Sequence, residues 1–303
     1  MKSITVFTPT YNRAYCLPIL YESLLRQTDR DFEWLVIDDG SQDTTRELMQ
    51  GWISDAKIDI KYHYKENGGM HTGHNAAYSL IETELNVCVD SDDFLPDNGI
   101  ELMLSRWRKD GSDKYGGMIG LDEAVSGGII GTQFPEGLKE CTYGELGPRY
   151  GVFCDKKLVY RTEVVKRYDP YPVFPDERFV PLYFPYLVDA DYKLLCYNDV
   201  FCIVDYQQDG STVNIYAQYF RHPKGFSYSR KIEMRYIPFV KIKFKSAIHY
   251  VATSIISKNW NFLAESPKKI YTFLAIPFGI AAYFFLRMKR SKPKKLALPN
   301  PGS

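Results

Sequence analysis

The sequence predicts an α/β fold in which a mainly parallel sheet is flanked by helices. Over the first 110 residues, short apolar segments alternate with longer segments whose apolar residues recur at helical spacing. The connections between them are short, as in repeated strand–helix units with right-handed crossovers. The apolar segments are nearly continuous, which is typical of parallel strands covered on both faces.

Each element of this half follows from a local pattern. Leu17, Leu20 and Leu24 recur at helical spacing and predict the first helix. Gly68 and Gly69 permit a turn before the third helix, because glycine readily adopts positive φ. We expect strands at residues 4–8, 33–38, 58–64 and 87–89, and helices at residues 15–27, 43–53 and 72–83.

Polar residues follow the end of each predicted strand. Ligands of open α/β sheets bind beyond the carboxyl ends of the strands, so these residues should face one cleft. They are Thr8, Tyr11, Asn12 and Arg13, then Asp38 and Asp39, then Gly68, Gly69 and Asn75, and finally Asp90 and Asp92. This set offers an aromatic face, carboxylates and amide donors, which fits a nucleoside diphosphate. The chain has neither GxGxxG after the first strand nor GxxxxGK[ST], so dinucleotide and P-loop sites are not expected.

Three carboxylates lie together in Val89-Asp90-Ser91-Asp92-Asp93. Carboxylates this close repel one another unless a cation neutralises them, and their oxygens suit Mn²⁺ or Mg²⁺. The alternative is an acidic turn that caps the next helix. His71 and His74 have the spacing of zinc ligands, but no third ligand of the usual spacing follows. A phosphate-side donor is the interpretation we favour for His71.

Four ordered segments resemble the signature of family 2 inverting glycosyltransferases with the GT-A fold. They are Thr8-Pro9-Thr10-Tyr11-Asn12-Arg13, Ile37-Asp38-Asp39-Gly40-Ser41, Asn67-Gly68-Gly69 and Val89-Asp90-Ser91-Asp92-Asp93. The resemblance implies that Thr8, Tyr11 and Asp39 hold the base, usually uracil, supported by Arg13 and Asp38. It also implies that Asp90 faces the ribose and diphosphate, and that Asp92 ligates Mn²⁺ or Mg²⁺. The predicted nucleotide site comprises Thr8, Pro9, Tyr11, Asn12, Arg13, Asp38, Asp39, Gly69, His71, Asn75, Asp90 and Ser91.

After residue 121 the strand–helix repeats stop, and glycines separate short apolar segments. This pattern predicts a mixed sheet that forms the acceptor half. An inverting transfer needs a carboxylate that accepts the proton of the attacking hydroxyl. Residues 174–181 resemble an acidic motif of capsule- and wall-building members of the family, with Glu177 at the position of the presumed base. Asp176 is the second choice. Alternatively, these two acids begin a helix, and Asp189 and Asp191 are rival bases within a helical pattern.

Composition separates an acidic body from a basic tail. Residues 1–220 contain 21 Lys and Arg against 35 Asp and Glu, whereas residues 221–303 contain 17 against 2, a net charge of +15 for the tail. This asymmetry predicts an anionic partner for the tail. The six cysteines lack CxxC spacing and are interpreted as free thiols. A strand begins at once at the N-terminus without a signal peptide, so we expect the catalytic body on the cytoplasmic side.

Residues 270–286 contain no charged residue and are flanked by lysines and arginines on both sides. A spanning helix needs ~20 apolar residues, and Pro277 and Gly279 are expected to interrupt this one. Basic flanks on both sides also disfavour crossing. The segment is interpreted as a monotopic or re-entrant helix at an anionic membrane surface, and a buried helix of a soluble body is the alternative.

We therefore expect a GT-A catalytic domain over residues 1–215, closed by Asp209-Gly210-Ser211-Thr212. It divides into a nucleotide half, 1–110, and an acceptor half, 111–215, and a basic helical region follows over 216–303. The predicted activity is metal-dependent transfer from a nucleotide sugar, with UDP as the expected nucleotide, to a lipid-linked or surface-polysaccharide acceptor. Nucleic acid is not an expected partner. The alternatives are a nucleotidyltransferase and a catalytically silent membrane adaptor that binds nucleotide.

Overall fold

The computed structural model describes residues 2–153, 155–205 and 214–290. These form two compact units, which are treated separately below. The first unit contains residues 2–170 and 192–205, and the second contains residues 171–191 and 214–290. The predicted closing segment at residues 209–212 and the lysines at 292, 294 and 295 lie outside the described residues.

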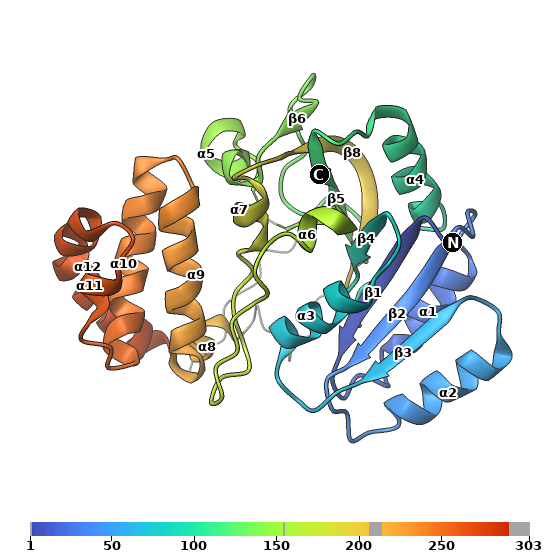
Figure 1. The fold of residues 1–303 in the computed structure, drawn as a ribbon, viewed down its shortest axis with the longest axis horizontal. Coiled ribbons are helices and arrows are strands. Elements are labelled where there is room, and N and C mark those ends of the chain that lie inside the picture. Colours follow the sequence, from blue (N-terminus) through green and yellow to red (C-terminus); the bar gives the residue numbers. More distant parts are fainter. Residues whose placement is uncertain (1, 154, 206–213, 291–303) are drawn as a thin grey trace. The chain divides into compact units, whose positions relative to one another are not determined.

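The first unit is built on one eight-stranded sheet with the order β3-β2-β1-β4-β7-β5-β8-β6 (Figure 1). Its strands are β1 Ile4–Thr10, β2 Phe32–Asp38, β3 Ile60–Tyr64, β4 Leu85–Cys88, β5 Tyr115–Ala124, β6 Glu140–Cys141, β7 Lys156–Arg161 and β8 Lys193–Val204. The strands β3, β2, β1 and β4 are parallel to one another. Strand β7 is antiparallel to both β4 and β5, so the sheet is mixed beyond β4. The predicted α/β class is confirmed.

Helices cover both faces of the parallel half, because its strands are apolar on both sides. The first unit contains α1 Leu17–Leu25, α2 Thr45–Asp55, α3 Met70–Leu80, α4 Gly99–Asp110, α5 Leu146–Tyr150 and α6 Thr162–Val165, with a short 3₁₀ helix at Tyr143–Glu145. Val6 and Trp34 pack with the apolar faces of α1, α2 and α4 in one core. Phe7 and Ile37 point to the opposite face, where Ala77 of α3 covers them. The helices cover the two faces of the sheet, so the carboxyl ends of the parallel strands remain available for the site.

The second unit consists of helices α7 Phe184–Val188, α8 Ile215–Arg221, α9 Pro223–Tyr236, α10 Val240–Ile256, α11 Phe262–Glu265 and α12 Lys269–Lys289. Segment 171–191, which the sequence analysis placed in the acceptor half, packs with these helices. The ring of Phe179 lies 5.7 Å from that of Phe226, and the ring of Tyr183 lies 5.4 Å from that of Tyr228. Aromatic contacts with α9 therefore hold this segment in the second unit.

Two local expectations in this unit are wrong. Asp189 and Asp191 were expected inside a helix, but α7 ends at Val188 and both residues follow it. Pro277 was expected to interrupt the apolar segment, but α12 continues through it to Lys289. Gly279 does not break the helix either. A Cβ atom there would lie 2.5 Å from Val251, so glycine permits close packing of α12 against α10.

Candidate functional site

The loops after β1 and β2 are joined by hydrogen bonds at the carboxyl edge of the sheet. The backbone N–H of Asp39 donates to the carbonyl of Thr10 at 2.8 Å. The N–H of Asn12 donates to Ser41 Oγ, and Asn12 Oδ1 accepts the N–H of Gln42, each at 2.8 Å. Asn12 adopts a positive φ of 53°, which asparagine tolerates better than most residues. These bonds fix the loop that presents Tyr11.

Tyr11 and Thr8 have opposite surroundings although both belong to the first motif. Tyr11 is 46% exposed. Thr8 is fully buried, and its hydroxyl accepts a hydrogen bond from the Trp34 indole at 3.0 Å. Its side chain therefore lies in the core behind the loop. Pro9 packs near Gly73 of α3, where an added Cβ would lie 3.1 Å from the proline ring.

Asp38 stabilises the turn after β2. Its Oδ1 atom accepts the N–H of Ser41 at 2.7 Å, and its Oδ2 atom accepts the Tyr62 hydroxyl at 2.5 Å. Burial, together with the hydrogen bond to Asp38, raises the pKa of Tyr62. Because both carboxylate oxygens have protein donors and the side chain is buried, Asp38 holds this turn from within.

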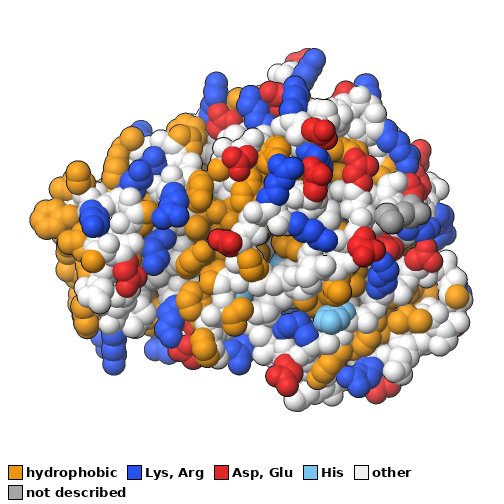
Figure 2. Space-filling model, in the orientation of Figure 1, with side chains coloured by type: hydrophobic (Ala, Val, Ile, Leu, Met, Phe, Trp, Pro, Cys, Tyr) orange, Lys and Arg blue, Asp and Glu red, His pale blue; other side chains and the backbone are white. Residues whose placement is uncertain are grey.

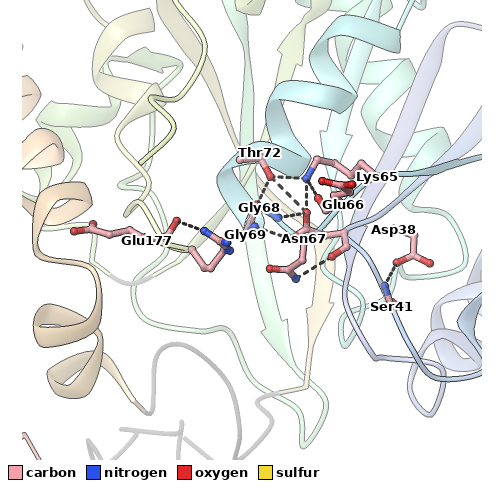
Figure 3. A network of polar contacts seen from close by, with 11 residues as sticks. Asp38, Ser41, Lys65, Glu66, Asn67, Gly68, Gly69, Thr72 and Glu177 are labelled. Atoms are coloured by element: carbon pink, nitrogen blue, oxygen red, sulfur yellow. Dashed lines mark hydrogen bonds and ion pairs between the residues drawn. The ribbon is translucent and has the colours of Figure 1, made fainter. Parts of the chain in front are cut away.

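Asp39 organises the loop that precedes α3. Its carboxylate is only 3% exposed and accepts the N–H groups of Gly68 and Gly69 at 2.9 and 2.7 Å. Lys65 Nζ lies 2.5 Å from Asp39 Oδ1 and 2.8 Å from Thr72 Oγ1. Figure 3 shows Lys65, Gly68, Gly69 and Thr72 converging in this network. Lys65 was missed by the sequence analysis, although it directly follows the third strand, at the same sheet edge as the other candidates.

The acidic loop after β4 reaches the loop after β1 through Arg13. Asp92 Oδ2 lies 4.0 Å from Arg13 Nη1, and about a fifth of each side chain is exposed. Asp90 is exposed, whereas Ser91 is buried. Arg13 also lies over the ring of Tyr15, with its guanidinium carbon 5.6 Å from the ring centroid. The structure thus brings the predicted base loop and the predicted metal loop together.

Behind Asp92 lies a buried group of charged residues that the sequence analysis did not single out. Asp93 Oδ2 is 3.7 Å from Lys157 Nζ, and both side chains are almost fully buried. Burial raises the pKa of Asp93 to about 8, although Lys157 opposes this effect. Burial also raises the pKa of Asp122 to about 6, again against the influence of Lys157. Burial therefore disfavours the ionised forms of Asp93 and Asp122 at this strand end.

The donor set of the acidic loop fits a hard divalent cation. Asp90 is exposed and Asp92 is partly exposed, and both offer carboxylate oxygens, the ligands that Mn²⁺ and Mg²⁺ prefer. Within residues 2–153, 155–205 and 214–290, no group of three His, Cys, Asp or Glu side chains is placed to hold a metal. A cation at Asp92 would therefore take further ligands from substrate phosphates and water, which is the usual arrangement for Mg²⁺.

The two histidines of α3 lie beneath the site. His71 and His74 are both buried, and Asn75 is half-buried. The His74 ring packs edge-on against Phe7 with centroids 5.3 Å apart. Burial lowers the pKa of His74 to about 4, so its imidazole is neutral at pH 7. His74 is therefore a core residue in this structure.

In the second unit, the predicted base Glu177 caps a helix. Its carboxylate is 2% exposed and accepts the N–H groups of Lys224 and Gly225, each at 2.8 Å, at the start of α9. Burial raises the pKa of Glu177 against the influence of these donors. Asp176 is exposed and pairs with Lys224 Nζ at 2.8 Å. The alternative that these acids begin a helix of their own is wrong, because neither lies in a helix.

Comparisons with known proteins agree with this geometry. A chondroitin synthase from Escherichia coli is 32% identical over 107 residues, covering 35% of this chain and 16% of the relative. The poly(ribitol-phosphate) β-N-acetylglucosaminyltransferase TarS from Staphylococcus aureus is 27% identical over 179 residues, covering 58% of this chain and 30% of the relative. The matches thus span less than a third of the length of these relatives.

Two solved structures share the fold. TarS 1-349 in complex with UDP-GlcNAc superposes with a TM-score of 0.60 at 16% identity, covering 95% of this chain and 91% of that chain. The mannosyltransferase PcManGT from Pyrobaculum calidifontis, in complex with GDP-Man and Mn²⁺, gives a TM-score of 0.58 at 16% identity, covering 95% and 83%. The expected GT-A architecture is confirmed. The model of the family named glycosyl transferase family 2 matches residues 5–168, which is more than half of the chain and includes every strand-end motif, so this chain belongs to glycosyl transferase family 2.

Proposed function

We propose that this chain is a metal-dependent, inverting glycosyltransferase that uses a UDP-sugar. The observation that carries the proposal is the approach of Arg13 to Asp92 at 4.0 Å, which joins the loop presenting Tyr11 to the acidic loop. An exposed aromatic ring, a cation and carboxylates then share one strand edge, where α/β folds bind nucleotides. TarS, which shares the fold, was solved with UDP-GlcNAc and so supports UDP as the nucleotide.

Each loop has a distinct role in nucleotide binding. Tyr11 stacks on the base, and Asp39 holds the loop of Gly68 and Gly69 in place. Among the described residues Asp39 Oδ2 accepts one hydrogen bond, so it has capacity for a second donor such as a base N–H. Asp90 faces the ribose and diphosphate. Arg13 offers a planar, permanently charged partner for the diphosphate.

Asp92 would hold the divalent cation. A bound Mn²⁺ or Mg²⁺ supplies Lewis-acid stabilisation of the diphosphate as it leaves. A carboxylate accepts the proton of the acceptor hydroxyl while its oxygen forms a bond to the anomeric carbon, and the bond from that carbon to the diphosphate oxygen breaks. We assign this base to Glu177, with Asp176 as the alternative. The products are the glycosylated acceptor and UDP.

We further propose a lipid-linked or surface-polysaccharide acceptor and attachment to the cytoplasmic face of the membrane. TarS and chondroitin synthase are named for polymeric acceptors or products, which supports a polymer or its lipid-linked precursor. Within the described residues, one helix, α12, is long and apolar enough to cross a membrane.

The test is release of UDP from a panel of UDP-sugars by the purified full chain, with Mn²⁺ and with EDTA. The Asp92→Asn variant is the matched control, because it keeps the size of the side chain and removes its charge. Metal-dependent release for at least one sugar, lost in the variant, supports the proposal. Binding of UDP without turnover of any donor would instead indicate a catalytically silent adaptor. Equal turnover by the variant would contradict the metal assignment.

A further inference from the structure

One face of α12 carries large apolar side chains without cover. Ile270, Phe273, Leu274, Phe278, Phe284 and Met288 are each more than half exposed. Separations of three, four, eight and fourteen residues among them place these side chains on one side of the helix. Figure 2 shows hydrophobic side chains gathered over α11 and α12. Such a contiguous patch marks an interaction surface.

The opposite face of α12 is fixed against α10. Thr272, Ala275, Gly279 and Leu286 are buried there. The close packing of Gly279 on Val251, where a Cβ would lie at 2.5 Å, means that the two helix backbones approach closely. The contacts of α12 are therefore specific along its length, and the helix is part of a folded bundle.

The bundle beneath α12 contains charged groups. Helix α10 packs in turn on α9, where Ser246 Oγ donates to Glu233 Oε2 at 2.5 Å and Glu233 pairs with Arg230 at 2.5 Å. Lys241 and Lys245 of α10 are exposed. Charged groups of this kind are costly inside hydrocarbon. The bundle cannot follow α12 into a bilayer, so a spanning α12 would have to leave α10.

The charges around α12 indicate the partner. Lys268 and Lys269 lie at its start, and Arg287, Lys289 and Arg290 lie at its end. The sequence has no acidic residue from 266 to 290. Basic residues prefer the cytoplasmic side of a membrane, so both ends of α12 favour the same side. Cations beside an apolar face are the signature of helices that lie on anionic lipid.

We propose that α12 lies in the plane of an anionic bilayer, with its Phe273 and Phe278 face among the acyl chains and both ends on the cytoplasmic side. This inference rests on the membrane attachment in the proposed function and decides how it occurs. At 21 residues the helix is roughly 30 Å long and could span a membrane by length alone. Its packing on α10 and its two basic ends oppose crossing.

The first test is flotation of the purified full chain with vesicles of phosphatidylcholine alone or with 30% phosphatidylglycerol. The double variant Phe273→Glu/Phe278→Glu is compared with Ile53→Glu, which changes an exposed apolar residue of α2 in the first unit. We expect binding to the anionic vesicles that falls at least tenfold in the double variant and is unchanged in the control. Equal binding by the double variant overturns the assignment of this face.

Metal-dependent UDP release is measured on the same samples, so that loss of membrane binding and loss of catalysis are told apart. If the chain releases UDP but binds neither kind of vesicle, the membrane inference is refuted. The proposed glycosyltransferase activity is then still supported. If the double variant converts a dimer into a monomer without any effect on vesicles, a second copy covers this face and the inference is wrong.

Trp260 provides a spectroscopic reporter. It is 72% exposed and lies between α10 and α11, whereas Trp34 and Trp107 belong to the core of the first unit and the partly buried Trp52 packs against that core. We expect its emission to shift to the blue with anionic vesicles and to be quenched by lipids brominated near the headgroup. Quenching only by lipids brominated at the bilayer centre would contradict an in-plane helix.

Topology is tested with cysteines placed singly at Lys268 and Arg290 of the full chain expressed in a bacterial host. A membrane-impermeant maleimide is applied to spheroplasts and to inverted vesicles, with the unsubstituted chain giving the background of native thiols. Labelling of both positions only in inverted vesicles supports the in-plane arrangement. Labelling of the two positions from opposite sides shows a spanning helix and overturns it.

Discussion

Replacement of Glu177 by glutamine separates the capping role of this residue from its proposed catalytic role. Each carboxylate oxygen accepts one N–H of the α9 N-terminus at 2.8 Å, and the side chain is 2% exposed. Glutamine keeps one acceptor and turns an NH₂ group toward the other N–H. A hydrogen bond to a charged group contributes about 1.5–3 kcal/mol, so we expect Glu177→Gln to lower the free energy of unfolding by about 2 kcal/mol.

The catalytic consequence is measured on the same variant. Loss of a general base lowers kcat by roughly 10²–10⁴-fold, while KM for the UDP-sugar should stay near its wild-type value. The assays are urea unfolding followed by circular dichroism and UDP release with acceptor present. Because burial raises the pKa of Glu177, wild-type kcat should increase with pH as this carboxyl loses its proton, and the variant should lack that limb of the profile.

Asp176→Asn is the control, since Asp176 is exposed and pairs only with the flexible Lys224 side chain among the described residues. We expect it to leave both unfolding and kcat near wild type. If Glu177→Gln loses stability but keeps kcat, the carboxylate is only a helix cap. If Asp176→Asn alone loses kcat, the base is Asp176. An unchanged unfolding free energy in Glu177→Gln would refute the capping argument itself.

Three further predictions concern the first unit. Asp92→Asn should keep the melting temperature of the metal-free chain, lose the stabilisation by Mn²⁺ with UDP seen in thermal melts, and lower transfer at least about 100-fold. The pKa of Asp122 is about 6 in the folded chain against ~3.9 unfolded, so its stabilising contribution is present at pH 4 and is lost as the pH rises through 6. Relative to Asp122→Asn, the wild type should lose about 2 kcal/mol between pH 4 and pH 7 in urea unfolding, and parallel curves would contradict this. Lys65→Met removes the cation beside Asp39 and should cost about 1–3 kcal/mol and weaken UDP binding in titration calorimetry; unchanged affinity would mean that the loop needs only Gly68 and Gly69.

The parallel half of the sheet was predictable because each of its elements is determined by residues close together in the sequence. Apolar strands, helical spacing and the glycine turn each lie within about a dozen residues, and parallel strands bring their ends to one edge without further information. The structure places Arg13 within 4.0 Å of Asp92, at that edge. Burial of Thr8 was not predictable, because it depends on Trp34 from the neighbouring strand.

The rest of the site depends on distant pairing. Lys157 and Asp122 come from β7 and β5, which join the sheet out of sequence order next to β4. No residue spacing in the sequence predicts that order of strands in the sheet. Glu177 likewise meets an N-terminus that lies 47 residues later. The alternative from the sequence was that Asp176 and Glu177 begin a helix of their own. Instead, the Glu177 carboxylate caps the N-terminus of α9.

Arg13 explains how the acidic loop can be assembled before any substrate arrives. Its guanidinium balances part of the charge of Asp92. The diphosphate of a UDP-sugar and a divalent cation carry opposite charges that nearly cancel, so their joint arrival changes the net charge of the site little. Either one alone leaves an uncompensated charge beside partly buried groups, which is unfavourable. We therefore expect Mn²⁺ and UDP each to raise the affinity for the other, because Arg13 turns from Asp92 to the diphosphate when the cation takes its place.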